Sequence, residues 1–419
     1  LNAFNDNLYK TAMVLFVVYA VYNDPEAETQ FSAIASALFI APFIFASAIS
    51  GQLADMRDKA KIIRTVKLCE IMLMTLGAAG LFLAWQGTLI HTFAIPLMLF
   101  ALFLAGIQST FLGPIKYSIL PQHLHRDEVL AGTGLIEAGT YIAILCGTIL
   151  AGWIPVEVAM VLILVTALVG YQVSRRIPAA PAMGEVEPID WNILRSSAAL
   201  VRFVLHDRVI YLATIAISVF WTVGAILFIQ FPPLAKNVIH ASKEVATLFI
   251  VMFSIGIAIG SVVINHLLKG KVSARYAPAS VILMGLFIVL FYVFVRQWPV
   301  GWEGELLSVR EFLAYPLAWV LLAILLLISI AGGSFVVPLY AFLTTRVAGN
   351  KASRTIAATN MISSIFMVGG AGLAILMTFI GIGIEEQLLA SVALCVLTSW
   401  AARRLYAEEH LPSAHLDHG

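Results

Sequence analysis

Residues 30–61 read QFSAIASALFIAPFIFASAISGQLADMRDKAK, and this stretch combines the two features that decide the fold. Positions 30–54 are almost entirely apolar, and a helix of about 20 such residues is long enough to cross the hydrocarbon core of a bilayer. Basic residues follow at once, at Arg57, Lys59 and Lys61. An apolar run that ends in basic residues is typical of a membrane-spanning helix whose end faces the cytoplasm.

The whole chain shares this composition. Of its 419 residues, 61% are hydrophobic and 12% are charged, and the mean hydropathy is +0.94. Soluble domains carry about 25% charged residues, and a single core stops growing near about 250–300 residues. A water-soluble globular protein is therefore excluded, and we expect an all-α polytopic membrane protein. The formal net charge of +1 gives no reason to expect a nucleic-acid partner.

Twelve windows are long and apolar enough to be transmembrane helices. They cover residues 1–22, 30–54, 62–85, 92–113, 128–154, 156–174, 209–234, 244–268, 276–296, 315–345, 354–380 and 386–405. A polar, proline-containing seam separates the sixth window from the seventh, and it includes a possible surface helix at Asp190–Val204. The sequence predicts two six-helix bundles, at residues 1–174 and 208–405, with a cytoplasmic linker at 175–207 and a cytoplasmic tail at 406–419.

The distribution of charge predicts the orientation, because Lys and Arg are retained on the cytoplasmic side of a membrane. Most of the 25 Lys and Arg residues lie in alternating loops, which include the central linker and the end of the last window. The other loops hold few bases, such as Lys236 and Lys243, and carry acids such as Asp24, Glu26 and Glu28. Both termini are therefore predicted to be cytoplasmic.

The first window carries polar residues that are expensive to place in a bilayer. Helical spacing puts Asp6 and Lys10 four residues apart on one face, with Asn2, Asn5 and Tyr9 beside them. Two interpretations stay open. The stripe lines a cavity, or Asp6 and Lys10 form an internal ion pair that only fixes helix packing.

Two further carboxylates fall inside predicted spans. Glu137 would lie about 14 Å into the fifth span at 1.5 Å per residue, where it either lines a cavity or relays protons, or is a satisfied structural acid. Glu70 follows Lys67 by three residues near the cytoplasmic edge of the third span. It is expected to snorkel or to pair locally.

Two segments at the predicted cytoplasmic boundary complete the candidate residues. Pro114 breaks the fourth span and leaves Lys116 and Tyr117 where they could meet an anionic headgroup, although Lys116 could equally be a plain anchor. The loop that holds Gly51, Asp55, Arg57 and Lys59 is predicted to act as a latch. In this loop glycine allows close helix approach, and Asp55 can cap a neighbouring helix.

The two halves resemble each other in sequence, as parallel repeats do, at a constant offset of 227 residues. This offset pairs Gly106 with Gly333 and Thr133 with Asn360. The first half holds the charges, and the second half is rich in aromatic residues. These aromatic residues are Trp221, Phe228, Phe231, Phe249, Phe335 and Phe342. A cavity with one ionic wall and one aromatic wall would suit a ligand with a polar head and an apolar tail, whereas the alternative is that the aromatic residues face lipid.

Four blocks carry a family resemblance: FNDNLYK at residues 4–10, GPIKYSILP at 113–121, GLIEAGT at 134–140 and GGSFVVPLY at 332–340. With the six-plus-six layout and the loop at residues 51–61, they resemble the bacterial lysophospholipid transporter family of the major facilitator superfamily. One departure is Thr133, where relatives often have Asn.

The resemblance implies import of lysophosphatidylethanolamine-type lipid from the outer to the inner leaflet of the bacterial inner membrane by alternating access. An acyltransferase–acyl-carrier-protein synthetase, separate or fused, would then reacylate the lipid. The family's headgroup-side polar residues match Asp6, Lys10, Lys116 and Glu137. The full set of candidate substrate-binding residues is Asn5, Asp6, Tyr9, Lys10, Lys116, Tyr117, Glu137, Tyr340 and Asn360, and the candidate gating residues are Gly51, Asp55, Arg57 and Lys59.

Two rival functions remain open. The first is a proton-coupled transporter of another lipophilic small molecule, with Glu137 or Asp6 as the proton carrier. The second is the membrane domain of a fused acyltransferase, but the His-x4-Asp motif of such enzymes is absent, and no GxSxG, Walker or paired-His metal pattern is found. We therefore expect a transporter and not an enzyme, with no cofactor.

Overall fold

The computed structural model describes the chain except for residues 125–128, 182–188, 270–272, 300–304, 347–348 and 410–419. Within the described residues the chain is helical, and the β-structure there is an isolated bridge between Ala241 and Leu307. In the first half the helices are α1 (Asn2–Phe16), which the π-helical turn η1 (Val17–Val21) extends, α2 (Pro25–Met56), α3 (Lys59–Trp85), η2 (Ile90–Ala94), α4 (Ile95–Ser118), α5 (Leu120–His123), α6 (Val129–Trp153) and α7 (Val156–Ser174). α8 (Ile193–His206) lies in the linker. The helices of the second half are α9 (Arg208–Asn237), α10 (Lys243–Leu268), α11 (Ala277–Val295), α12 (Val309–Ala314), α13 (Pro316–Arg346), α14 (Gly349–Phe379) and α15 (Ile384–Glu409).

Each of the twelve predicted windows coincides with a helix, and the predicted surface helix is α8. Ten helices in the described ranges are long and apolar enough to cross a membrane. The first and fifth windows are not among those ten. α1 has 15 residues before its π-helical turn, and the apolar part of α6 that qualifies as a shorter helix runs from Ile142 to Trp153. The predicted all-α membrane fold is confirmed.

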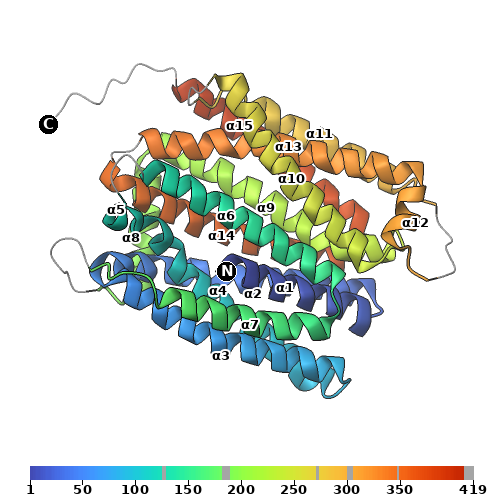
Figure 1. Cartoon of the computed structure of the whole chain (residues 1–419). Helices are drawn as coiled ribbons and strands as arrows, with labels where there is room; N and C mark the ends of the chain where they lie inside the picture. Colours follow the sequence, from blue (N-terminus) through green and yellow to red (C-terminus); the bar gives the residue numbers. More distant parts are fainter. Residues whose placement is uncertain (125–128, 182–188, 270–272, 300–304, 347–348, 410–419) are drawn as a thin grey trace.

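The helices pack in two groups of neighbours (Figure 1). In the first half α1 packs against α6 and α7, α3 against α4 and α7, and α2 against α4. In the second half α13 packs against α10 and α11, and α15 packs against α9 and α11. Between the halves, α2 packs along α14, and α6 packs against α10. This arrangement agrees with two bundles, although the predicted boundaries at residues 174 and 208 stay a prediction.

Four of the six aromatic residues predicted to line a cavity or to face lipid are buried in the core of the second half, whereas Trp221 and Phe228 are half-buried. Phe231, Phe249 and Phe335 are fully buried, and Phe342 is 2% exposed. Phe249 packs edge-on against Phe231 and Phe291, at centroid distances of 5.9 and 6.5 Å, and Phe335 packs at a tilt against Phe220. Both interpretations, cavity wall and lipid contact, are therefore wrong for these four residues. Mutual burial of rings inside one bundle satisfies them instead.

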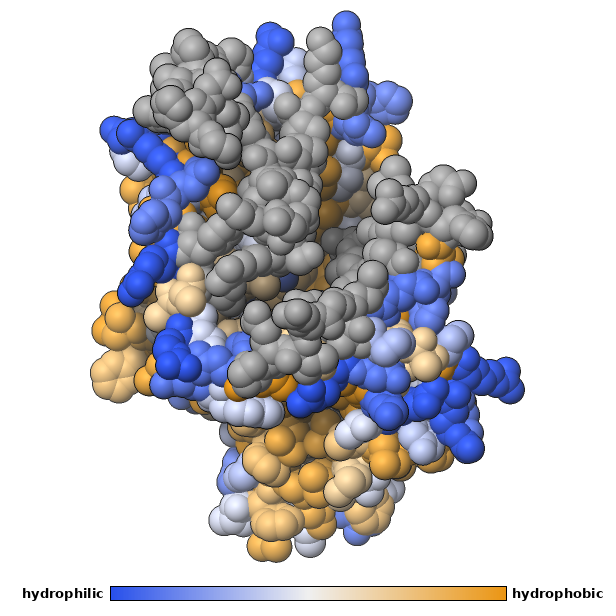
Figure 2. All heavy atoms as spheres, turned by 90° about the vertical axis from the view of Figure 1, so that its left-hand side faces the viewer, coloured by the Kyte–Doolittle hydropathy of each residue, from blue (hydrophilic) through white to orange (hydrophobic). Residues whose placement is uncertain are grey.

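The predicted latch loop contacts the central linker. Arg57 is exposed and donates to the carbonyl of Met56, whereas Lys59 is 3% exposed and its backbone N–H donates to the Ala180 carbonyl at 2.9 Å. The Asp55 side chain lies outside the described residues. The cap predicted for Asp55 on a neighbouring helix therefore stays a prediction. Asp58 caps α3, and its carboxylate accepts from the N–H groups of Ala60 and Ala180. Hydrophilic side chains gather at the end of the molecule that carries this loop (Figure 2).

Replacing Asp58 by alanine is expected to loosen the linker from this loop. Burial acts to raise the pKa of Asp58, but hydrogen bonds from Ala180, Lys61 and Ala60 outweigh it and hold the pKa below its usual value. Since the folded pKa is the lower one, this stabilisation is present above the usual carboxyl range and is lost as the pH falls through the folded pKa. A lost N-cap costs about 1 kcal/mol, so hydrogen exchange at Ala180 should rise about five-fold in the variant.

Asp24→Ala is the matched control for this exchange measurement. Asp24 caps α2 by the same geometry, accepting from Glu26 and Ala27, but it does not contact the linker. Exchange at Ala180 should therefore stay unchanged in this control. An equal rise at Ala180 in both variants would show that Asp58 does not tether the linker.

Candidate functional site

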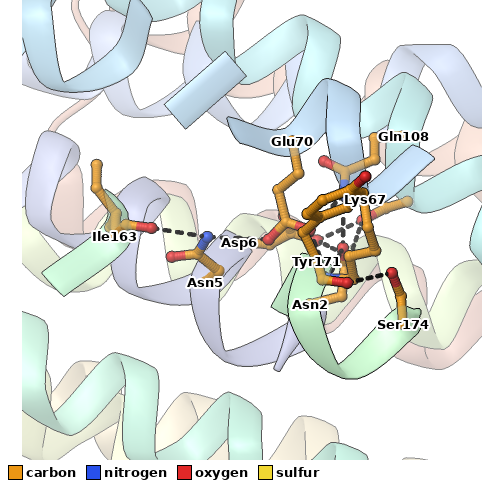
Figure 3. Close-up of polar contacts among 10 residues, drawn as sticks. Asn2, Asn5, Asp6, Lys67, Glu70, Gln108, Ile163, Tyr171 and Ser174 are labelled. Carbon is orange, nitrogen blue, oxygen red and sulfur yellow. Dashed lines mark hydrogen bonds and ion pairs between the residues drawn. The ribbon is translucent and has the colours of Figure 1, made fainter. Parts of the chain in front are cut away.

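Seven polar side chains meet inside the first bundle, and we call them the polar cluster. They are Asn2, Asn5 and Asp6 of α1, Lys67 and Glu70 of α3, and Gln108 and Ser109 of α4. Figure 3 labels all of them except Ser109 and shows the labelled side chains from separate helices pointing toward one another. Asn2, Asn5 and Asp6 can lie on a membrane-spanning helix because they contact polar partners on α3 and α4 and not lipid.

Glu70 is the centre of the polar cluster. It is fully buried and forms an ion pair with Lys67, which is 7% exposed. Asn5 donates to Glu70 Oε1 at 2.9 Å, and Gln108 donates to Oε2 at 2.9 Å. The predicted local pairing of Glu70 is confirmed. The snorkelling alternative is wrong, because three donors hold the carboxylate inside the bundle.

Asp6 lies at the edge of the polar cluster without the predicted ion pair. Its Oδ2 accepts from Asn2 at 2.8 Å and from the Ser109 hydroxyl, while its Oδ1 is buried and has no hydrogen-bond partner in the described structure. The side chain is 4% exposed. The Asp6 carboxyl is thus buried and accepts hydrogen bonds from neutral groups only, within the described residues. The predicted Asp6–Lys10 ion pair is not found among the described residues.

Lys10 lies one helical turn beyond Asp6 and is half-buried. Its ammonium nitrogen lies 5.3 Å from the centroid of the Phe39 ring of α2. The negative face of an aromatic ring attracts a cation. The ring has no oxygen or nitrogen atom that could accept a hydrogen bond from the ammonium group. Within the described residues no hydrogen bond or ion pair to Lys10 is found. The ammonium group of Lys10 can therefore bind an anion.

Tyr9 and Asn5 lie in the interior of the bundle. Tyr9 is 1% exposed and its hydroxyl donates to the Met98 carbonyl at 2.8 Å. Its ring packs on Gly77, where a Cβ atom would come within 2.7 Å of the ring. Asn5 donates to both Glu70 and the Ile163 carbonyl. In this conformation the helix-packing interpretation describes both residues, and any contact with substrate stays a prediction.

Three further predicted residues are described, and they are not among the seven of the polar cluster. Lys116 is half-buried on α4 beyond Pro114, Asn360 is exposed on α14, and the Tyr340 hydroxyl accepts from the Trp221 indole at 2.9 Å. The candidate residues whose side chains lie outside the described structure are Asp55, Tyr117, Thr133 and Glu137.

A second polar site, which the sequence analysis missed, joins the two halves at the opposite end from the basic loops. We call this end, where α1 and α9 finish and α2 and α10 begin, the outer end, after its predicted orientation. Lys236 of α9 pairs with Glu28 of α2 at 2.5 Å and also donates to the carbonyls of Val18 and Tyr22. Glu28 is fully buried and accepts a second bond from Asn237. The signal in the sequence was Lys236, one of the few bases on the side that carries Asp24, Glu26 and Glu28.

The chain was compared with protein families and with solved structures. The family model described as "Major Facilitator Superfamily" matches residues 1–371. The Lysophospholipid transporter LplT of Escherichia fergusonii is 27% identical and covers 96% of this chain and 94% of its own length. The Lysophospholipid transporter LplT of Serratia proteamaculans is also 27% identical, over 96% of this chain and 93% of its own length.

Solved structures support the same fold at low sequence identity. A D-xylose-proton symporter superimposes with a TM-score of 0.67 at 12% identity and covers 96% of each chain. A bacterial homologue of the human lysosomal transporter Spinster, in an inward-facing state, gives 0.65 at 13% identity over 99% of this chain and 98% of its own length. With twelve matched helices and a family model that spans most of the sequence, this multi-pass membrane protein belongs to the Major Facilitator Superfamily.

Proposed function

We propose that the protein transports lysophospholipids, and that it moves lysophosphatidylethanolamine-type lipids from the outer to the inner leaflet of the bacterial inner membrane. The observation that carries the proposal is Lys10, a half-buried cation on the polar stripe of α1, one turn from the carboxyl of Asp6. The names of the relatives that are similar over nearly the whole chain support the substrate class.

The chemistry of the substrate explains why such a pair is useful. A lysophospholipid has one acyl chain, which can stay in hydrocarbon, and a zwitterionic head, whose exposure to an apolar medium costs several kcal/mol (roughly 2–7 per unsatisfied polar group). Lys10 would meet the phosphate, with Lys116 nearer the cytoplasmic boundary, and Asp6 would meet the ammonium by charge-assisted bonds. Rocking of the two bundles against each other would move the shielded head across.

Under this proposal, the protein supplies lysophospholipid for reacylation at the bacterial inner membrane. Both termini would be cytoplasmic, as the basic loops predict. The lipid delivered to the inner leaflet would be reacylated by an acyltransferase–acyl-carrier-protein synthetase, either as a separate partner or as a fused domain. Membrane lipids would be the other partners, and the transporter itself would need no cofactor.

Uptake of radiolabelled lysophosphatidylethanolamine into spheroplasts tests the proposal. Lys10→Gln and Asp6→Asn keep the size of each side chain and remove its charge, and each should lower uptake at least ten-fold, since charge-assisted hydrogen bonds contribute about 1.5–3 kcal/mol. Lys61→Gln and Glu26→Gln are matched controls at exposed positions and should transport normally. Normal uptake by both test variants at equal expression would end the assignment.

One observation favours proton coupling as a second candidate. Asp6 is buried, neutral groups supply both of its described hydrogen bonds, and one of its oxygens has no partner. Such a carboxyl is a suitable proton carrier. A protonophore should collapse uptake in wild type. If it does not lower the residual uptake of Asp6→Asn any further, the coupling is assigned to this residue.

A further inference from the structure

A short amphipathic helix lies at the end of the molecule that carries the basic loops, which we call the basic end. This helix is α8 (Ile193–His206), and Figure 1 shows it at the same end as α5. It packs against α2 of the first half and against α9 and α14 of the second half, so it contacts both halves. None of the functions derived above uses the side that α8 turns away from these helices.

The contacts of α8 place it at the level of a membrane surface. The Gln52 amide donates to the Ser196 hydroxyl of α8 at 3.2 Å, and Gln52 lies within Pro25–Ala54, a segment of α2 that is long and apolar enough to cross a membrane. Asp207 alone separates the last residue of α8 from α9, which is another of these helices. α8 therefore lies where membrane-spanning helices end, and lipid headgroups occupy that level of a bilayer.

The outward side of α8 carries an apolar stripe. Trp191, just before the helix, is 66% exposed, and Leu194 and Leu205 are 80% and 58% exposed. Leu194, the exposed Ala198 and Leu205 are four and seven residues apart, and this spacing puts them on one side of a helix. Val204 is buried, so a different side of α8 packs on the bundles. A contiguous exposed apolar stripe marks a contact site for a protein or a membrane, and tryptophan is enriched at membrane interfaces.

Two arginines lie beside the apolar stripe. Arg195 and Arg202 are both exposed and are seven residues apart, so they form a second stripe along the same side of α8. Arg195 pairs with Asp190 at 2.7 Å, yet its side chain stays 73% exposed, and no ion pair of Arg202 is found among the described residues. Asp207, the acid at the other end of α8, caps the first turn of α9. The exposed side of α8 is therefore basic, which fits an anionic surface.

An apolar stripe beside a basic stripe is typical of a helix that lies in a membrane surface. The apolar side of such a helix enters about 5–10 Å into the boundary between headgroups and acyl chains, and its bases meet anionic lipids. The methylene groups of arginine can contact apolar surface while the guanidinium reaches a phosphate. Each base near the surface favours an anionic lipid by about five-fold. The level of α8 favours a membrane over a soluble protein as the partner, because lipid surrounds the ends of the neighbouring helices.

We propose that the exposed side of α8 binds anionic diacyl phospholipids in the leaflet at the basic end, which is the cytoplasmic leaflet in the predicted orientation. Trp191, Leu194 and Leu205 contact the acyl chains, and Arg195 and Arg202 contact the phosphates. Because α8 packs on α2 and on α14, a lipid bound there lies beside helices of both halves. This lipid is a partner and not the transported ligand, so the inference does not rest on the proposed function.

Fluorescence quenching of the full chain in nanodiscs tests this lipid site. Ala198→Cys, in a background without the native cysteines, carries an NBD fluorophore on the exposed side of α8. The nanodiscs contain equal amounts of phosphatidylcholine and phosphatidylglycerol, and a small fraction of one or the other lipid carries a nitroxide quencher on its acyl chain. We expect the labelled phosphatidylglycerol to quench about five-fold more efficiently than the labelled phosphatidylcholine, or more. In the double variant Arg195→Gln, Arg202→Gln this ratio should fall to about one, because the charges that select the anionic lipid are gone.

The double variant Arg275→Gln, Arg403→Gln is the matched control, since it removes two exposed bases at the basic end that lie outside α8. It should keep the quenching ratio of wild type. Absence of quenching by either lipid in wild type would place the apolar stripe in water or against a soluble protein, and would overturn the site. Equal quenching by the two lipids in wild type, or an equal loss of the ratio in the control and in the test variant, would also overturn it, because anionic lipid would then not be selected by Arg195 and Arg202.

Discussion

Removing the Glu28 carboxylate is expected to raise the ratio of molecules that are open at the outer end to molecules that are closed there roughly 30-fold. Glu28 is fully buried, pairs with Lys236 at 2.5 Å and accepts from Asn237 at 2.5 Å, so α2 and α9 are joined across the two halves. Truncating one partner of a buried, hydrogen-bonded charge pair costs about 2–5 kcal/mol, and 2 kcal/mol corresponds to this factor. The remaining bonds of Lys236 to the Val18 and Tyr22 carbonyls do not replace the lost charge pair.

Distances between spin labels at Thr88 and Gln297 measure this shift. Both residues are exposed in loops at the outer end, one in each half. In a background without the native cysteines, Glu28→Ala should move most of the distance distribution to longer values. A second label pair at Lys61 and Arg275, both exposed at the opposite end, should move to shorter values if the halves rock.

Glu26→Ala is the control for this conformational prediction. Glu26 lies on the same first turn of α2, but it is exposed and its described side-chain partner is Gln30. Its removal should leave both distance distributions unchanged. Identical distributions in wild type and Glu28→Ala would mean that the buried pair does not hold the outer end closed.

Hydropathy could predict the helices of this protein because the membrane imposes one rule on the whole chain. Each apolar run must form a helix that satisfies its own backbone, so windows such as 62–85 and 244–268 lie within α3 and α10. The basic loop could also be found, since its charges interrupt the apolar pattern. The contact of Asp58 with Ala180 could not be predicted, because it joins residues that lie 122 positions apart in the sequence.

The partners of the polar residues were beyond the sequence for a different reason. Spacing on α1 predicts which residues share a face, but it does not say which helix that face contacts. Asp6 and Lys10 looked like one pair, yet Asp6 turns to Asn2 and Ser109 while Lys10 lies over Phe39. The aromatic residues of the second half posed the same problem, since burial between helices of one bundle leaves no periodic signal that distinguishes it from a cavity wall.

Glu70→Ala is expected to lower the free energy of unfolding by about 3–5 kcal/mol, because it leaves the buried ammonium of Lys67 without its partner. It also removes one acceptor from Asn5 and one from Gln108, which keep their bonds to the Ile163 carbonyl and to Asn2. Thermal unfolding of the purified protein in detergent, followed by tryptophan fluorescence, measures the loss. The control is Asp190→Ala, whose partner Arg195 is 73% exposed. An exposed pair contributes about 0–1 kcal/mol.

A double variant separates the charge of this pair from the shape of the polar cluster. Lys67→Met with Glu70→Leu removes both charges at similar volume, and buried ion pairs replaced in this way are often neutral. Because Asn5 and Gln108 would still lack one of their two acceptors, we expect the double variant to recover more than half, but not all, of the stability that Glu70→Ala loses. If it recovers nothing, the amide donors and not the charge hold the cluster together. If it folds like wild type and still takes up lysophospholipid, the Lys67–Glu70 pair is a packing element, and Asp6 and Lys10 remain as the charges on α1 that transport would require.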